Sequence, residues 1–79
     1  MHITLYKTPT CPYCKLTRDL LKELNVEWHE VDVSMDHAKA KEMIDKSGSM
    51  GVPVLEINGR IIVGFNPDLI KEAVAASRK

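Results

Sequence analysis

The chain of 79 residues lacks a net charge, a long apolar run and any excess of cysteine, and each lack excludes a class of protein. Its eleven basic residues are balanced by eleven acidic ones, so it has no net positive charge with which to bind nucleic acid or an anionic membrane. The longest stretch without a charged residue, residues 47–55, is far shorter than the roughly 18 apolar residues of a membrane-spanning helix. We therefore expect no nucleic acid and no membrane among its partners.

The composition is that of an ordinary globular domain. Apolar residues make up 44% of the chain and charged residues 28%, close to the averages for soluble proteins. A length of 79 residues is one domain's worth, so we expect a single domain over residues 1–79 that acts as a monomer. The first residues show neither the basic stretch nor the apolar core of a signal peptide, which predicts a cytoplasmic protein.

The two cysteines stand together in the unit Cys11-Pro12-Tyr13-Cys14. A disulfide between them would close a very short loop, and such a loop stabilises a fold little. Small secreted proteins instead distribute their cysteines so that disulfides join distant segments. The spacing therefore indicates a pair of cysteines that carries out chemistry.

Hydrophobic periodicity and turn residues predict seven elements in the order β-α-β-α-β-β-α. Alternating segments predict strands over residues 2–6, 26–33, 52–57 and 60–63, and Asn58-Gly59 is a strong hairpin signal between the last two. Helical spacing predicts helices over residues 13–24, from a cap at Ser34 or Asp36 to about 46, and from Pro67 after the cap Asn66 to about 77. Their apolar positions are Leu16, Leu20, Leu21 and Leu24; Ala40, Met43 and Ile44; and Leu69, Ile70, Ala73 and Val74.

This order predicts an α/β fold with one mixed four-stranded sheet and three helices packed on it. A helix joins the first two strands, so these should be parallel with a right-handed crossover. The last two strands should form an antiparallel hairpin.

The Cys-x-x-Cys unit falls at the start of the first predicted helix. Cys11 lies at the N-terminal edge and Cys14 one turn further along the same face, which brings the two sulfurs within reach of each other. The positive end of the helix stabilises a thiolate at Cys11. The first eighteen residues also contain Lys7, Lys15 and Arg18 but no acid, so we expect electropositive surroundings.

Metal and haem sites compete for such a motif. A c-type haem site needs histidine after the second cysteine, where this chain has Lys15. Zinc would need two more ligands, and His2, His29 and His37 are not spaced as in a zinc finger. A zinc-binding structural domain is the least favoured alternative.

Three segments, residues 6–14, Gly51-Val52-Pro53 and residues 64–68, resemble those of the glutaredoxins and glutaredoxin-like redoxins, in order and along the whole chain. The resemblance implies a thioredoxin fold and thiol-disulfide exchange, with no metal or organic cofactor and with glutathione as a candidate co-substrate. It also implies that Cys11 is the nucleophile and Cys14 the resolving thiol.

The resemblance further implies a cis peptide bond before Pro53 and a substrate that pairs with the backbone of Val52. The substrate-binding residues expected from it are Lys7, Pro12, Tyr13, Gly51, Val52, Pro53, Gly64, Phe65 and Asn66.

Several positions depart from glutathione-using glutaredoxins. Thr8 replaces the lysine that stands three residues before the nucleophile, and Gly51 replaces a threonine. Pro67 replaces part of a Gly-Gly-Cys-Asp stretch and can offer neither an N–H nor a carboxylate. The Gly-Phe-x-Pro-Asp segment instead resembles NrdH-type redoxins, which take electrons from thioredoxin reductase. The electron donor therefore stays open between thioredoxin reductase and glutathione.

Family analogy names a ribonucleotide reductase or a peroxidase as a candidate substrate protein. It also leaves one alternative of another kind, a module in which Cys11 binds an iron-sulfur cluster shared across a dimer. The proline after Cys11 and the second thiol at Cys14 disfavour that alternative.

Overall fold

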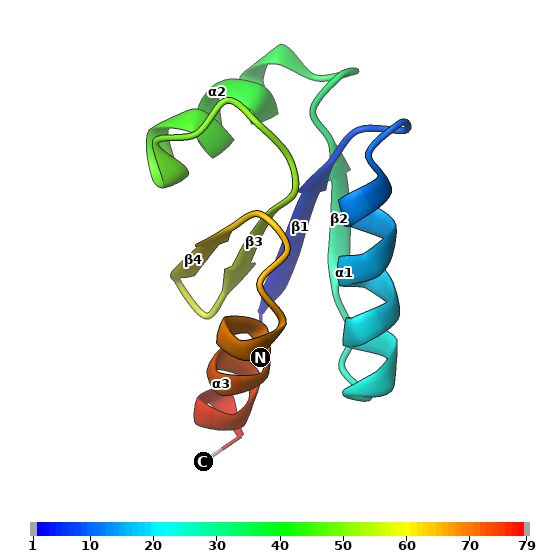
Figure 1. The fold of residues 1–79 in the computed structure, drawn as a ribbon. Coiled ribbons are helices and arrows are strands. Elements are labelled where there is room, and N and C mark those ends of the chain that lie inside the picture. The colour runs from blue at the N-terminus through cyan, green and yellow to red at the C-terminus, as the bar shows by residue number, and fades with distance from the viewer. Residues whose placement is uncertain (1, 79) are drawn as a thin grey trace.

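The computed structural model describes residues 2–78 and shows the seven predicted elements in the predicted order (Figure 1). The elements are β1 (Ile3–Lys7), α1 (Pro12–Glu23), β2 (His29–Asp32), α2 (His37–Ser47), β3 (Val54–Ile57), β4 (Arg60–Val63) and α3 (Pro67–Ser77).

The four strands form one mixed sheet in the order β2-β1-β3-β4. As predicted, β1 and β2 are parallel, and β3 and β4 are an antiparallel hairpin. The central pair, β1 and β3, is antiparallel as well. At the hairpin, Asn58 and Gly59 have φ values of 48° and 85°, which are the positive values that a type I′ turn requires at both positions.

The two faces of the sheet carry separate hydrophobic clusters. Helices α1 and α3 cover one face, where Leu21 and Ile70 meet the strand residues Leu5 and Leu55. Helix α2 covers the other face, and its Met43 packs on Tyr6 and Val54. This arrangement follows from the alternation of side chains along each strand.

Side-chain caps fix where the helices begin. The Asp36 side chain accepts a hydrogen bond from the N–H of Lys39 at 3.1 Å, and the Asn66 side chain accepts one from the N–H of Leu69 at 3.2 Å. Pro67 occupies the first position of α3. These contacts satisfy N–H groups that have no partner within the helix, and they confirm the predicted caps.

Three expectations about the elements need correction. Leu16 and Leu69 were expected on buried faces but are 45% and 42% exposed, because they lie at the margins of the apolar stripes of their helices. On α2, Ala40 and Ile44 are only half-buried. Strand β2 covers four residues instead of eight, since it is an edge strand whose pairing is limited to the length of β1.

Within residues 2–78, no helix is both long enough and apolar enough to cross a membrane.

Candidate active site

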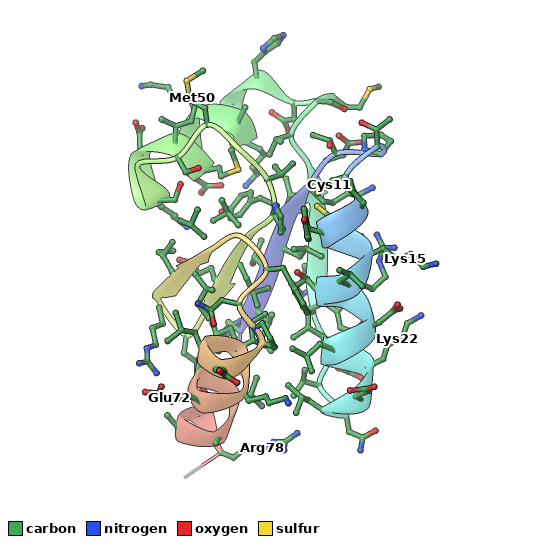
Figure 2. All side chains as sticks on the ribbon, in the orientation of Figure 1. Cys11, Lys15, Lys22, Met50, Glu72 and Arg78 are labelled. Carbon is green, nitrogen blue, oxygen red and sulfur yellow. The ribbon has the colours of Figure 1, made fainter. Side chains whose placement is uncertain are left out.

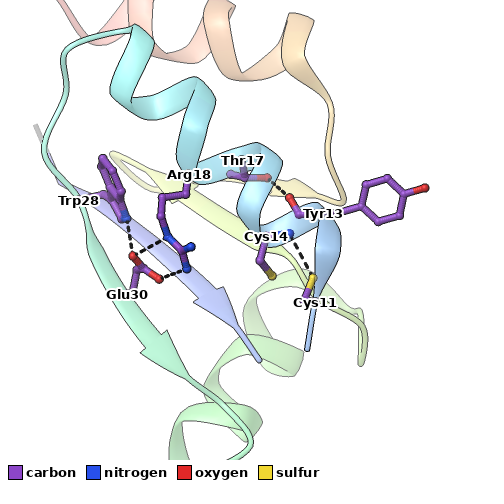
Figure 3. Close-up of polar contacts among 7 residues, drawn as sticks. All are labelled: Cys11, Tyr13, Cys14, Thr17, Arg18, Trp28 and Glu30. Atoms are coloured by element: carbon purple, nitrogen blue, oxygen red, sulfur yellow. Dashed lines mark hydrogen bonds and ion pairs between the residues drawn. The ribbon is translucent and has the colours of Figure 1, made fainter. Parts of the chain in front are cut away.

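The loop between β1 and α1 places Cys11 at the start of the helix (Figure 2). Cys11 is the N-cap residue of α1, and its own N–H donates to the carbonyl of Thr8 at 3.3 Å. The N–H of Cys14 donates to the Sγ of Cys11 at 3.2 Å (Figure 3). The Sγ of Cys11 thus has a backbone N–H donor at the start of α1.

The two thiols differ in accessibility. Cys11 is partly exposed, whereas Cys14 is 2% exposed. Burial raises the pKa of Cys14 to about 12, and its hydrogen bond with the Cys11 side chain acts in the same direction. A backbone hydrogen bond with Thr8 and the positive charge of Arg18 oppose this rise. Another molecule can therefore reach the Cys11 sulfur more readily, while Cys14 stays protonated behind it.

The raised pKa of Cys14 predicts that the reduced protein loses stability in alkaline solution. Between about pH 8.5 and pH 10 the unfolded chain releases this proton while the folded chain retains it, so the free energy of unfolding falls as pH rises. The loss is at most about 1.4 kcal/mol for each pH unit. Urea denaturation at pH 8, 9 and 10 measures it, and Cys14→Ala should remove this part of the pH dependence. An unchanged slope in Cys14→Ala would contradict the prediction.

A cavity of about 410 Å³ opens beside the two cysteines. Two of the predicted binding residues, Lys7 and Pro12, line it together with both cysteines. Its full lining is Lys7, Thr8, Pro9, Thr10, Cys11, Pro12, Cys14, Lys15 and Arg18. A larger cavity of about 560 Å³ is lined by His2, Ile3 and residues 26–30 and includes neither cysteine.

The charge around this cavity differs from what the first eighteen residues indicate. Three cations line it, as expected, but β2 brings two acids close to them. Glu30 accepts two hydrogen bonds from Arg18, and Asp32 is the register partner of Lys7. The count of charges over the first eighteen residues did not include these two acids, because they belong to the next strand of the sheet. The alternation of β2 and its parallel pairing with β1 were the signals that could have located them.

The remaining predicted residues lie on other segments. The Val52–Pro53 peptide bond is cis, as the resemblance implied, and the N–H of Gly64 donates to the carbonyl of Pro53 at 2.9 Å. This hydrogen bond joins the loop before β3 to the loop before α3. Gly64 has a φ of 77°, which favours glycine at that turn. Gly51 belongs to the first of these loops, and its N–H donates to the Ser49 hydroxyl.

Three predicted binding residues have environments of their own. Tyr13 is 58% exposed, and its ring extends away from the helix into solvent (Figure 3). Phe65 packs against the cluster under α1 and α3, and the Asn66 side chain caps α3. Phe65 and Asn66 thus contribute to the fold, and the substrate-binding roles expected of these three residues stay predictions.

Within residues 2–78, no three His, Cys, Asp or Glu side chains come together in a group that could hold a metal ion. His2 and His29 line the larger cavity, and His37 is the first residue of α2.

Comparison with known proteins supports the resemblance. The glutaredoxin family model matches residues 3–62. A glutaredoxin-like 8.6 kDa protein of the rubredoxin operon in Clostridium pasteurianum is 48% identical over 64 residues, which are 81% of this chain and 85% of that protein. Glutaredoxin 3 of Escherichia coli K12 is 35% identical over 63 residues, 80% of this chain and 76% of that protein.

Among solved structures, the NrdH-redoxin of Escherichia coli superposes with a TM-score of 0.79 and 25% identity, over 91% of this chain and 93% of that one. That redoxin is described as a glutaredoxin-like protein with a thioredoxin-like activity profile. The structural similarity confirms the predicted thioredoxin-like architecture of three helices and a four-stranded mixed sheet.

Proposed function

Because the chain belongs to the glutaredoxin family, we propose that it is a small dithiol oxidoreductase that reduces protein disulfides through Cys11 and Cys14. The observation that carries this proposal is the arrangement of the two thiols. Cys11 is accessible and accepts the N–H of Cys14 at the start of α1, whereas Cys14 is buried one turn behind it. Glutaredoxin-family relatives such as glutaredoxin 3 are thiol oxidoreductases.

The proposed reaction has two exchange steps. The Cys11 thiolate attacks one sulfur of the substrate disulfide, that S–S bond breaks, and the departing thiolate takes a proton from solvent. In the second step Cys14 loses its proton and attacks the Sγ of Cys11. The mixed disulfide breaks, the second substrate thiol leaves, and Cys11 and Cys14 form a disulfide. Two electrons have then passed from the protein to its substrate.

The proposed substrate approaches across the loop that holds Val52 and Pro53, with the exposed ring of Tyr13 beside it. Support comes from the hydrogen bond between Gly64 and Pro53, which holds this loop and the next in a fixed relation. Tyr13 is 58% exposed and offers apolar area to a protein partner at little entropic cost.

We infer that thioredoxin reductase, and not glutathione, supplies the electrons. The resemblance places the γ-glutamyl end of glutathione at the start of α3, where this chain has Pro67 with no N–H to donate. The Asn66 side chain there already accepts the N–H of Leu69. Asp68 lies in the first turn of α3, where its negative charge interacts favourably with the positive end of the helix dipole.

The proposed function is tested by following NADPH consumption with an insulin disulfide as substrate under two donor systems. One system contains thioredoxin reductase, and the other contains glutathione and glutathione reductase. We expect turnover with thioredoxin reductase and little turnover with glutathione. Turnover with glutathione alone would overturn the donor assignment. No turnover with either donor, together with no acceleration of the reduction of insulin by dithiothreitol as followed by turbidity, would overturn the oxidoreductase proposal.

A further inference from the structure

The side chain of Arg18 lines the same cavity as the buried thiol of Cys14 and is hydrogen-bonded to Glu30 of β2. Arg18 stands four residues after Cys14 on α1, and both line the cavity of about 410 Å³. Residues four apart on a helix are neighbours on one face. In the view of Figure 3 the Arg18 guanidinium lies between the Glu30 carboxylate and the Cys14 side chain.

Glu30 fixes the guanidinium through both of its carboxylate oxygens. The Nε of Arg18 donates to Oε2 at 3.0 Å, and Nη2 donates to Oε1 at 2.7 Å. The indole N–H of Trp28 donates to the same Oε2 at 3.2 Å. The Arg18 and Glu30 side chains are 31% and 29% exposed, so water screens this bidentate pair less than it screens a fully exposed ion pair.

We propose that Arg18 and Glu30 are positioning residues for the second exchange step, in which Arg18 stabilises the thiolate of Cys14 and Glu30 limits that effect. This inference rests on the proposed function, because only a dithiol mechanism needs Cys14 as a thiolate. Cys14 must pass its proton to solvent before it attacks Cys11, and a nearby positive charge lowers the cost of that step.

The charges around Cys14 support this assignment. Lys7 on β1 and Lys15 on α1 also line the cavity, and Asp19 and Asp32 lie near Arg18 and Lys7 respectively. Among these charged side chains, the one that favours the charged form of Cys14 most is Arg18. Arg18 and its hydrogen bonds in turn lower the pKa of Glu30, so that the carboxylate stays ionised through the neutral range.

The two substitutions Arg18→Gln and Glu30→Gln separate this role from a purely structural one. If the ion pair only ties α1 to β2, both variants weaken the same link and change the second step in the same direction. If the charges act on Cys14, Arg18→Gln should slow that step and Glu30→Gln should speed it. The amide introduced by Glu30→Gln keeps a carbonyl that accepts a hydrogen bond from Arg18, so the guanidinium retains an anchor while losing the neutralising charge.

The test measures the second step directly. The mixed disulfide between Cys11 and a peptide thiol is formed in a rapid-mixing experiment, and its decay is followed by acid quench and mass spectrometry from pH 6 to pH 10. A shift of one pKa unit changes the thiolate fraction tenfold, but nucleophilicity falls with pKa, so we expect rate changes of about threefold near neutral pH. Because the rate rises with the thiolate fraction of Cys14, Arg18→Gln should need a higher pH, and Glu30→Gln a lower pH, to reach the same rate as the unmodified protein.

Controls keep this result interpretable. Arg18→Lys retains the positive charge without the planar guanidinium and should stay close to the rate of the unmodified protein. Trp28→Phe removes the hydrogen bond from the indole N–H to Glu30 but changes no charge. Thermal denaturation of every variant identifies any loss of folded protein. Equal slowing in Arg18→Gln and Glu30→Gln, or no change in either, would overturn the inference. Failure to form a mixed disulfide in the unmodified protein would instead count against the proposed function.

Discussion

Replacing Cys11 with serine should abolish disulfide reduction, and replacing Cys14 with serine should leave the first exchange step and stop the second. Serine at position 11 keeps the size of the side chain but has a hydroxyl that does not ionise at neutral pH, so no effective nucleophile remains. In Cys14→Ser the accessible thiol of Cys11 still attacks, because its place at the N-cap of α1 is unchanged. Mass spectrometry of the protein after mixing with a disulfide substrate should show a stable adduct in Cys14→Ser and none in Cys11→Ser.

The NADPH-coupled rate with a protein disulfide provides the second measurement for these variants. In Cys11→Ser and in Cys14→Ser this rate should fall to the background rate of the donor system alone. The adduct distinguishes the two causes, because it forms only when the first exchange step takes place. Cys14→Ala serves as a control for the hydroxyl and should trap the same adduct. If Cys14→Ser reduced protein disulfides at the full rate, Cys14 would not be the resolving thiol.

Local signals predicted most of the fold. Asn58-Gly59, the caps Asp36 and Asn66, and Pro67 at the start of α3 each depend on the backbone conformation of a few adjacent residues. Such signals are read from the sequence without any tertiary context. The parallel relation of β1 and β2 followed from the helix that joins them.

The features that sequence did not predict depend on neighbours from distant segments. Leu16 and Leu69 have the spacing of buried residues, but the width of the contact between each helix and the sheet decides which side chain at the margin is covered. The partner of Arg18 is Glu30, twelve residues later and on another element. Counting charges along the sequence therefore overstated the positive field around the two cysteines.

Among truncations to alanine in α1, Leu21→Ala should cause the largest loss of stability. Leu21 is fully buried in the cluster that joins α1 and α3 to the sheet. Truncation of such a side chain costs about 2–5 kcal/mol, because it removes buried apolar area and leaves a cavity. For a domain of this size each kcal/mol lowers Tm by about 4–8 °C, so we expect a decrease of at least about 8 °C by differential scanning calorimetry.

Leu16→Ala is the matched control, since it makes the same chemical change within the same helix at a side chain that is 45% exposed. Both variants gain the same small helix propensity from alanine, so the difference between their Tm values isolates the burial of Leu21. We expect Leu16→Ala to cost less than about 1 kcal/mol, in line with surface substitutions. Cys11 caps α1 and Cys14 lies within it, so loss of the packing of this helix in Leu21→Ala should also lower activity in proportion to the unfolded fraction. Equal Tm values for the two variants would mean that α1 does not pack through the face that contains Leu21.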